Sequence, residues 1–405
     1  MFAAIADGTT RIRNFATSVD CGSTLDCLEA LGVPVSRNGT SVEIRGVGKR
    51  GLKKPEAPLD CGNSGTTMRL MAGILAGQRF ESVMTGDESL RSRPMKRVIE
   101  PLTAMGAPIR SVEGRAPLTI RGNNPLTAID HTLKVASAQI KSCVLLAGLN
   151  ASGITSVTEP VATRDHTERM LRWFGVDVRE EHTETGKITS VSGESLLTAR
   201  DLYVPGDVSS AAFFAVAAAC LPNSDLTLLN VGLNPTRTAS IDVIREFGAN
   251  IRLSDSQAAS NEPSGDIRIT GNSKLSGGKR LAGDIIANLI DEVPILAVLG
   301  TQADGGLEIR DAAELRVKES DRIATVVDNL RRMGASVEEF PDGLRVERSR
   351  LRPAALDSFG DHRIAMAFAV AALFTDGKSV IRGAECVDVS FPGFFDVLGE
   401  IAERG

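Results

Sequence analysis

Apolar residues in the last third of the chain recur at the spacing of an amphipathic helix. They are Ile323, Val326, Val327, Leu330 and Met333, and the i, i+3, i+4, i+7 spacing puts them on one face. Gly334 follows them directly, where a glycine typically ends a helix. The pattern therefore predicts a helix that begins near residue 323 and ends at Gly334.

The seven residues before this helix, RVKESDR at 316–322, carry five charges. We expect Lys318 and Arg322 to lie four residues apart on one face of the first helical turns. Cations at a helix N-terminus oppose the helix dipole unless an anion lies there too. The cluster therefore indicates an anion site, although a solvated charged turn is the simpler alternative.

Four other helix starts have a related pattern. In LDCGNSGTTMR (59–69), turn-forming residues precede an apolar helix with Arg69 in its first turn, and in DHRIAMAFAVAALF (361–374), Asp361 is the expected N-cap with Arg363 just inside. SAQIKS (137–142) and GDVSS (206–210) place small hydroxyl residues at helix starts. Five such starts in one chain favour a site for a small polyanionic molecule.

The chain also repeats one local pattern: an apolar helix end, a glycine and the start of a strand. The five copies are LEALGVPV (28–35), LTAMGAPI (102–109), LRWFGVDV (171–178), IREFGANI (244–251) and LRRMGASV (330–337). Strand candidates such as SVEIRG, PLTIRG, DIRITG and GLRVE follow most of them. The copies are too far apart for a solenoid and indicate α/β subdomains of strands and two helices. Helix–glycine–strand is also a common capping arrangement in unrelated α/β proteins.

Composition restricts the function further. The chain has 405 residues, 42% of them hydrophobic and 24% charged, which is enough for two domains with substantial cores. A net charge of −5 and an aromatic content of 4% argue against a nucleic-acid binder. The apolar runs near 211–221 and 364–374 are too short for a bilayer span, so we expect no membrane partner.

Cysteines and histidines give no sign of a metal centre. The six cysteines form no CxxC pair, which suits buried thiols in a reducing cytoplasm, and the four histidines lack ligand spacing. The sequence also has no GxGxxG motif after a strand. We therefore expect no metal site and no nucleotide-binding motif, and a small phosphorylated metabolite as the ligand.

Four motifs in this order, LDCGNSGTTMR, SAQIKS, RVKESDR and DHR, resemble the 5-enolpyruvylshikimate-3-phosphate synthase family over essentially the whole chain. The resemblance implies an α/β fold of two domains, each built from three βαβαββ units, with helix N-termini facing the interdomain cleft. We place the first domain, on the shikimate phosphate side, at 1–205. The second, with the acid, base and carboxylate-binding residues, is placed at 206–405.

The resemblance also implies a reaction and its residues. The enolpyruvyl group of phosphoenolpyruvate passes to the 5-hydroxyl of shikimate 3-phosphate, in the shikimate pathway to aromatic amino acids, without metal or cofactor. The implied catalytic residues are Glu319 as proton donor to the methylene, Asp291 at the 5-hydroxyl and Lys318 beside the shikimate hydroxyls. The implied substrate-binding residues are Arg93 for the phosphate of phosphoenolpyruvate, Arg322 and Arg363 for its carboxylate, Asn63, Gly65 and Arg69 on the phosphoenolpyruvate side, and Ser137, Ala138, Gln139 and Arg164 for shikimate 3-phosphate.

Each assignment has a structural alternative. Asp291 could be a helix cap before Pro294, and Glu319 could form a surface ion pair with Arg316 or Arg322. Arg93 could be one solvated cation of the RSRPMKR segment. Ser137 and Gln139 could serve only to cap their helix.

Three departures from the family pattern stand out. The family's GDKSISHR-like segment, with a lysine, a serine and an arginine, has no counterpart before Met1, so we expect the chain as given to be poorly soluble or feebly active. Val389 stands where some members carry a lysine, and Ala138 where some carry a second serine. The second change should cost at most one hydrogen bond, about 0.5 to 1.5 kcal/mol.

Two rival functions remain open. The sister enolpyruvyl transferase that acts on UDP-N-acetylglucosamine usually carries a loop cysteine near the position of Ser92, and SLRSRP has none. A catalytically weakened or dead substrate-binding form is the other rival. For the protein itself, we expect a cytoplasmic monomer.

Overall fold

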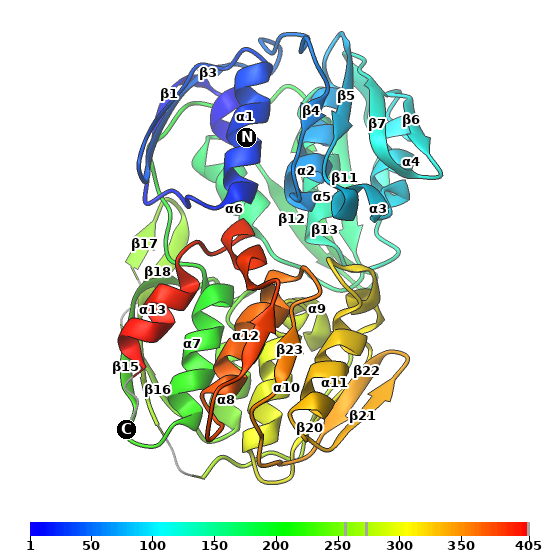
Figure 1. The fold of residues 1–405 in the computed structure, drawn as a ribbon. Helices are drawn as coiled ribbons and strands as arrows, with labels where there is room; N and C mark the ends of the chain where they lie inside the picture. The colour runs from blue at the N-terminus through cyan, green and yellow to red at the C-terminus, as the bar shows by residue number, and fades with distance from the viewer. Residues whose placement is uncertain (255–256, 272–273, 403–405) are drawn as a thin grey trace. The chain divides into compact units, whose positions relative to one another are not determined.

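The computed structural model describes residues 1–254, 257–271 and 274–402 as two compact units (Figure 1). Unit 1 comprises residues 1–204 with 259–261, and unit 2 comprises 205–258 and the chain from 262 onward. The short segment 259–261 joins unit 1 through side chains: Tyr203 N donates to Ser260 Oγ at 3.0 Å, and Asn261 Nδ2 donates to the Arg169 carbonyl at 2.9 Å. The predicted domains, 1–205 and 206–405, assigned residues 259–261 to the second domain.

Unit 1 contains three repeats of strands and helices. The first has η1 (Phe2–Ile5), β1 (Asp7–Arg13), α1 (Val19–Ala30), β2 (Val35–Asn38) and β3 (Ser41–Val47). The second has β4 (Leu59–Asp60), α2 (Gly65–Ala76), β5 (Glu81–Thr85), α3 (Glu88–Ser92), α4 (Lys96–Ala104), β6 (Ile109–Val112) and β7 (Arg115–Arg121). The third has β8 (Leu126–Thr127), β9 (Asp130–Thr132), α5 (Ala138–Gly148), β10 (Ala151–Ser152), β11 (Ile154–Glu159), α6 (His166–Trp173), β12 (Arg179–Thr183), β13 (Gly186–Ser192) and, closing the unit, β14 (Leu202–Tyr203).

Unit 2 follows the same plan. Its first repeat has α7 (Val208–Cys220), β15 (Asp225–Gly232), α8 (Ala239–Glu246), β16 (Asn250–Leu253), β17 (Gln257–Ala259) and β18 (Glu262–Thr270). The second has β19 (Lys279–Leu281), α9 (Ile285–Leu289), α10 (Val293–Gln302), β20 (Leu307–Ile309), η2 (Ala313–Val317), α11 (Arg322–Arg332), β21 (Val337–Phe340) and β22 (Gly343–Val346). The third has β23 (Ala355–Asp357), α12 (His362–Ala372), β24 (Val380–Arg382), η3 (Ala384–Val389) and α13 (Phe394–Ile401).

The sheets show the repeat directly. The orders β4-β5-β7-β6, β9-β11-β13-β12 and β19-β20-β22-β21 each place the first two strands parallel and the fourth strand of the repeat between the second and third. In the first repeat the outer position belongs to β14, which pairs parallel to β1. Among the described residues, the last repeat has a sheet of two strands, β23 and β24. The predicted strands at 41–46, 117–122, 266–271 and 343–347 correspond to β3, β7, β18 and β22.

The helix–glycine–strand pattern marks the end of five helices, α1, α4, α6, α8 and α11, each followed by a strand. Gly32, Gly106, Gly175, Gly248 and Gly334 all have φ between +79° and +93°. This left-handed conformation favours glycine because a Cβ atom would clash with the backbone. The predicted helix that ends at Gly334 is confirmed as α11, whose C-cap is Met333.

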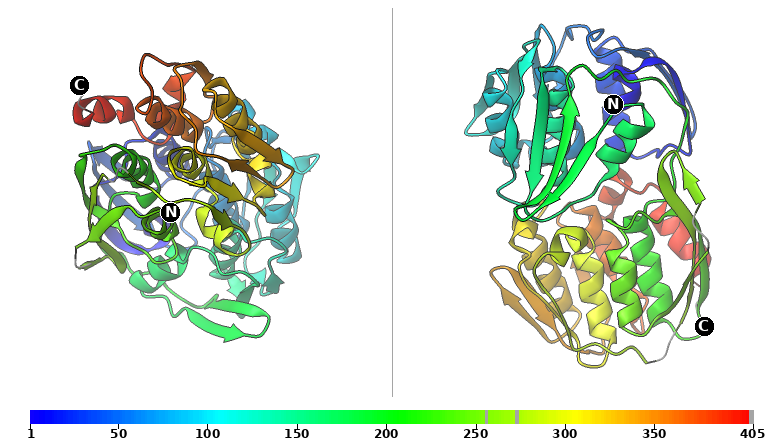
Figure 2. Two further views of the ribbon diagram at one scale, coloured as in Figure 1. Left: turned by 90° about the horizontal axis from the view of Figure 1, so that it is seen from below. Right: turned by 180° about the vertical axis from the view of Figure 1, so that it is seen from behind.

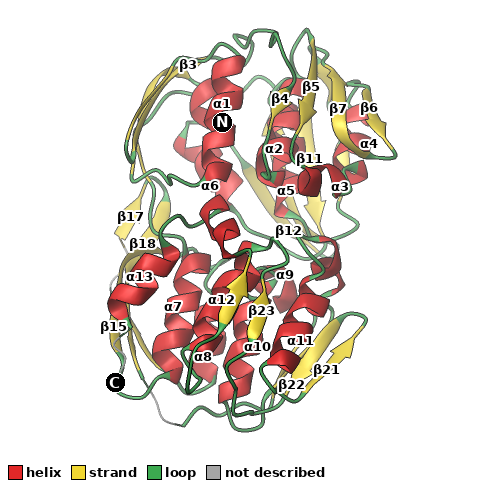
Figure 3. Cartoon of the chain, viewed as in Figure 1, coloured by secondary structure: helices red, strands yellow, loops and turns green. Residues whose placement is uncertain are grey.

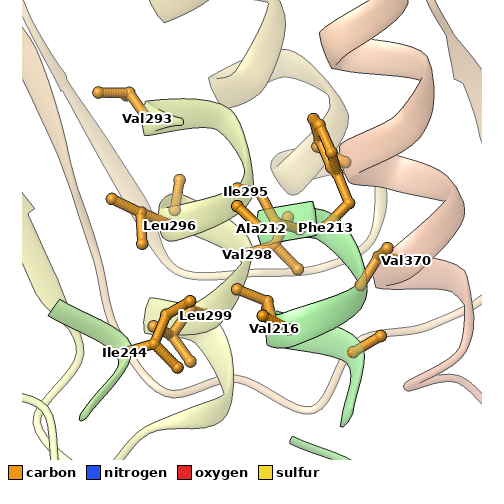
Figure 4. Close-up of a cluster of buried hydrophobic side chains, with 14 of the residues drawn as sticks. Ala212, Phe213, Val216, Ile244, Val293, Ile295, Leu296, Val298, Leu299 and Val370 are labelled. Atoms are coloured by element: carbon orange, nitrogen blue, oxygen red, sulfur yellow. The ribbon is translucent and has the colours of Figure 1, made fainter. Parts of the chain in front are cut away.

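The core of each unit is made of helices that are apolar on all sides. In unit 2, α7, α10 and α12 pack together through Phe213, Val216, Leu296, Val298 and Val370 (Figure 4). A helix with no polar face must be covered on every side. The larger sheets of each unit lie on the outer side of its buried helices, whereas α13 runs along the surface (Figures 2 and 3). The helix N-termini are therefore among the few polar parts of these buried segments.

Candidate active site

Helices α2 and α5 of unit 1 run side by side in backbone contact. A Cβ atom added at Gly73 of α2 would lie 2.2 Å from the carbonyl oxygen of Cys143 in α5, so only glycine permits this approach. Near the starts of the two helices, Gln139 Nε2 donates to Thr66 Oγ1 at 2.8 Å. The helices thus run parallel, and the positive ends of two dipoles lie next to each other.

Neutral serines cap both helix starts. Ser64 Oγ accepts from Thr67 N at 3.1 Å, and Ser137 Oγ accepts from Ile140 N at 3.4 Å. The expectation that Ser137 caps its helix is confirmed, and Ala138 is the first residue of α5. Since no carboxylate caps either helix, the dipole ends keep their positive potential for an anion.

Arg69 extends from α2 toward α5. Its Nη1 donates to Gln139 Oε1 at 2.7 Å. Gln139 therefore bridges the two helices and is not a cap, so the capping alternative for this residue is wrong. Arg69 is the fifth residue of α2 and lies one turn further along the helix than the sequence predicted.

Arg93 approaches the same point from the end of α3. Its side chain is buried, at 6% exposure, and Nη2 donates to Asn63 Oδ1 at 2.7 Å. The alternative of a solvated cation is therefore wrong. A Cβ atom at Gly65 would lie 2.8 Å from Arg69 Nη1 and 3.3 Å from Arg93 Nη1. The two guanidinium groups thus converge on the bare backbone of Gly65.

Arg164 lies in the connection between β11 and α6. Its backbone carbonyl accepts from Lys141 Nζ at 2.9 Å, and Lys141 belongs to α5. The structure thereby links the segment of Arg164 to the helix that begins with Ala138 and Gln139. Unit 1 brings the predicted residues from four segments of sequence into one region.

Unit 2 gathers its predicted residues around Arg322. The Arg322 side chain is 1% exposed and has three carboxylate partners: Nε lies 2.8 Å from Asp361 Oδ2, Nη2 lies 2.6 Å from Glu319 Oε2, and Nη1 lies 3.3 Å from Asp291 Oδ1. Glu319 does pair with Arg322, as one alternative proposed, but the partner is buried. The anions at this helix start are protein side chains.

The position predicted for Lys318 is wrong. Lys318 follows the short helix η2, and α11 begins four residues later at Arg322 with Asp321 as its N-cap. The carboxylate of Asp321 accepts from Ala324 N at 3.0 Å and stops the helix from extending back to Lys318. Lys318 Nζ instead donates to Asp291 Oδ1 at 3.3 Å.

Asp291 is not a helix cap, because Glu292 occupies the N-cap position of α10. Its carboxylate lies between Lys318 and Arg322, and its backbone carbonyl accepts from Arg363 Nη1 at 2.9 Å. Arg363 Nη1 also donates to Ser209 Oγ at 2.7 Å. Asp291 is therefore in contact with all three cations of this cluster.

Burial and charge set the ionisation of the cluster. Burial alone would raise the pKa of the Asp361 carboxyl, but the Arg322 guanidinium outweighs it and lowers that pKa below its usual value. Burial opposes the charge on Arg322, yet Asp361, Glu319 and Asp291 raise its pKa. Burial, followed by the charge of Arg363, lowers the pKa of His362 to about 4, so this imidazole is neutral at pH 7.

Three residues of this region escaped sequence reasoning. Asp361 was expected only as a cap; it does cap α12 through Arg363 N, at 2.9 Å, and is also the main partner of Arg322. Ser209 donates its hydroxyl hydrogen to Glu292 Oε1, and Glu292 lies 3.8 Å from Arg363 Nη1. The adjacent acids at 291–292 and the serine of GDVSS were the available signals.

The described residues contain no group of three or more histidine, cysteine, aspartate or glutamate side chains that could hold a metal ion. Within this same part of the chain, every helix is too short or too polar to cross a membrane.

Comparison with known proteins places the chain in a family. A family model described as EPSP synthase (3-phosphoshikimate 1-carboxyvinyltransferase) matches residues 1–398. A 3-phosphoshikimate 1-carboxyvinyltransferase of Solibacter usitatus is 52% identical over 405 residues, covering 100% of this chain and 93% of the relative. The protein of that name from Pelotomaculum thermopropionicum is 53% identical, covering 99% and 92%.

A solved EPSP synthase structure from Acinetobacter baumannii superposes with a TM-score of 0.87 at 44% identity, covering 99% of this chain and 92% of that one. The predicted fold class is thereby confirmed. The chain belongs to the EPSP synthase family.

Proposed function

We propose that this chain transfers the enolpyruvyl group of phosphoenolpyruvate to the 5-hydroxyl of shikimate 3-phosphate and releases phosphate. The product, 5-enolpyruvylshikimate 3-phosphate, belongs to the pathway to aromatic amino acids. The observation that carries the proposal is the convergence of Arg69 and Arg93 at Gly65, the first residue of serine-capped α2, next to the serine-capped start of α5. Family membership supports it across the chain.

The two groups of residues differ in charge, and the difference matches two tasks. In unit 1 the caps Ser64 and Ser137 are neutral and the nearby cations add positive charge, which suits phosphate groups. In unit 2 the helix starts carry carboxylates, and Arg322 is surrounded by three carboxylate side chains. We assign phosphate binding to unit 1 and proton transfer to unit 2.

For unit 1, Arg93 holds the phosphate of phosphoenolpyruvate, and Asn63, Gly65 and Arg69 shape that side. The hydrogen bond between Arg93 and Asn63 fixes the guanidinium plane, which suits two-point binding of oxyanions. Shikimate 3-phosphate is held at the start of α5 by Ser137, Ala138 and Gln139, together with Arg164. The first three of these residues lie at the start of α5, and Arg164 lies on the loop that is hydrogen-bonded to α5 through Lys141.

For unit 2, the carboxylate of phosphoenolpyruvate binds Arg363 and Arg322. Arg363 is the more accessible cation, whereas Arg322 is enclosed by three carboxylates. A substrate carboxylate reaches Arg322 by taking the place of Glu319 on Nη2. A carboxyl group that loses its cationic partner holds a proton more readily, which a donor to the methylene carbon requires.

The reaction then proceeds by addition and elimination. The 5-hydroxyl oxygen attacks C2 of phosphoenolpyruvate while Glu319 delivers a proton to C3, and Asp291 takes the hydroxyl proton. Lys318, 3.3 Å from Asp291 Oδ1, stabilises the carboxylate and orients it toward the hydroxyl. Loss of a proton from C3 then expels phosphate from C2 and restores the C2–C3 double bond, which gives the enol ether product. Neither step needs a metal or an organic cofactor.

Measurement of phosphate release from both substrates, with product identified by mass spectrometry, tests the proposal. We expect turnover in the presence of a metal chelator. Activity that disappears with chelator and returns with a divalent ion would contradict the cofactor-free mechanism. Turnover of UDP-N-acetylglucosamine, and not of shikimate 3-phosphate, would contradict the proposed acceptor substrate. We further propose a cytoplasmic monomer; the free cysteines are compatible with a reducing compartment.

A further inference from the structure

Lys141 is a fully buried cation that the reaction does not use directly. Its ammonium nitrogen lies 2.9 Å from Glu159 Oε2, 2.7 Å from Glu168 Oε1 and 2.9 Å from the carbonyl oxygen of Arg164. The side chains of Lys141 and both glutamates are 0% exposed. Two of these contacts are hydrogen bonds that Nζ donates, to Glu159 Oε2 and to the Arg164 carbonyl, and Glu168 adds a second ion-pair partner.

Charge balance alone does not require the third of these contacts. Glu159 and Glu168 already supply two negative charges, and Lys187, 3.7 Å from Glu168, continues the network toward Glu180. A buried ion cluster is weak support for stability, because well-packed apolar side chains often serve as well. The bond to the Arg164 carbonyl is different, since it fixes the position of a backbone segment.

The residue before Arg164 is hydrogen-bonded to the same buried cluster. Thr163 donates to Glu159 Oε1 from its backbone nitrogen at 3.2 Å and also from its hydroxyl. Two consecutive residues of the loop between β11 and α6 are thus tied to buried charges. On the far side of Arg164, Thr167 Oγ1 lies 2.6 Å from Ser142 Oγ of α5.

We infer that Lys141 is a positioning residue: it fixes Arg164 relative to the start of α5, so that Arg164 and the group at Ser137 and Gln139 bind one phosphorylated substrate together. The inference rests on the proposed function, which assigns these residues to shikimate 3-phosphate. Lys141 itself touches no substrate. Its effect is exerted through the backbone of Arg164 and is confined to the shikimate 3-phosphate side.

The first test compares affinities for the two substrates. Lys141→Met alone removes the main cationic partner of two buried carboxylates and can prevent folding, so the main variant combines Lys141→Met with Glu159→Gln and Glu168→Gln. We expect its Kd for shikimate 3-phosphate, measured by calorimetry, to rise about tenfold, the scale of one lost charge-assisted contact. The KM for phosphoenolpyruvate at saturating shikimate 3-phosphate should change by less than about twofold.

A milder variant covers the case in which the triple variant does not fold. Thr163→Val removes one hydroxyl bond to Glu159 and leaves all charges in place. We expect a rise of about threefold in the Kd for shikimate 3-phosphate, in line with one neutral hydrogen bond. Lys187→Met is the matched control, because Lys187 joins the same network without a contact to the loop; it should lower thermal stability and leave that Kd unchanged.

A double-mutant cycle separates this inference from the proposed function. If Lys141 acts through Arg164, adding the triple substitution to Arg164→Ala should change the Kd by less than about twofold further. If the increases in Kd caused by the triple substitution and by Arg164→Ala instead multiply in the combined variant, Lys141 does not act through Arg164. A folded triple variant, or Thr163→Val, that binds like the parent would overturn the inference alone. Normal shikimate 3-phosphate binding by Arg164→Ala would instead refute the role that the proposed function gives to Arg164.

Discussion

Arg322 and Asp361 form an ion pair that is withdrawn from solvent. Nε of Arg322 lies 2.8 Å from Oδ2 of Asp361, and the two side chains are 1% and 0% exposed. A second contact, from Arg322 Nη2 to Asp361 Oδ1 at 3.3 Å, makes the pair bidentate. It joins the start of α11 to the start of α12, so the helices that begin at the ends of RVKESDR and within DHR are fixed to each other by charged residues of the two motifs.

This pair predicts a large loss of stability for Asp361→Asn. The substitution keeps a side chain that can cap α12 but leaves Arg322 with one fewer buried anion, which should cost about 3 kcal/mol. Chemical denaturation measures it. The control is Asp376→Asn, which breaks the pair with Arg350, where both side chains are 88% exposed; that should cost less than about 1 kcal/mol. Equal losses for the two variants would show that burial of the Arg322 pair has no energetic consequence.

Glu319→Gln should separate catalysis from binding. It retains the shape of the side chain and removes the acid, so we expect kcat to fall about a hundredfold or more with both KM values nearly unchanged. Steady-state kinetics measures this. Glu338→Gln makes the same change on the exposed strand β21 and should leave kcat as it is. An undiminished rate for Glu319→Gln would remove this residue from the mechanism.

Gly65→Ala should weaken phosphoenolpyruvate binding selectively. The added methyl group would lie 2.8 Å from Arg69 Nη1 and 3.3 Å from Arg93 Nη1, so at least one guanidinium must move. We expect the KM for phosphoenolpyruvate to rise about tenfold, equivalent to 1.4 kcal/mol, while the Kd for shikimate 3-phosphate stays near that of the parent. Gly22→Ala in α1, where an added Cβ meets nothing within 4 Å, is the control. A larger effect on shikimate 3-phosphate would reverse our assignment of this region.

His362 should make the protein sensitive to mild acid. Its pKa is lowered by burial to about 4 from the ordinary 6.5. Between these values the unfolded chain binds a proton that the folded chain rejects, so the free energy of unfolding falls as the pH drops from 6.5 toward 4, by up to about 3 kcal/mol. Denaturant unfolding at pH 7 and pH 4.5 should show this loss in the parent and a smaller one in His362→Gln. His182→Gln, at an exposed position of β12, should behave as the parent does; a parallel pH dependence of all three would exclude His362 as the cause.

Local signals in the sequence were sufficient for much of the fold. The five glycines after apolar helix ends were identified by spacing alone, and each adopts a left-handed backbone conformation. The helix starts at Ser64, Ser137, Asp207 and Asp361 were also predictable, since a short polar side chain before an apolar run satisfies the first free backbone N–H groups. These features depend on residues within one or two turns of each other.

The candidate site was only partly predictable for the opposite reason. Lys318 was expected on α11, but Asp321 caps the helix and α11 begins only after it. In a run of five charged residues, nothing in the sequence marked Asp321 as the cap. Asp361 was identified as a cap, yet its pairing with Arg322, 39 positions away, could not be predicted from either motif. Residues 259–261 were placed in the second domain because nothing in their sequence indicates contacts with Tyr203 and Arg169.

The sequence by itself determined where the helices start and stop, the repeated α/β plan and, through its four motifs, the family. Only the tertiary structure decided which charges are buried together: Arg322 among three carboxylates, Arg69 and Arg93 at Gly65, and Lys141 beneath the Arg164 loop. Caps and turns are set by interactions between near neighbours in the chain. The partner of a buried charge is set by which distant segments the apolar helices bring into contact, because a charge removed from water must find its counter-ion wherever packing places one.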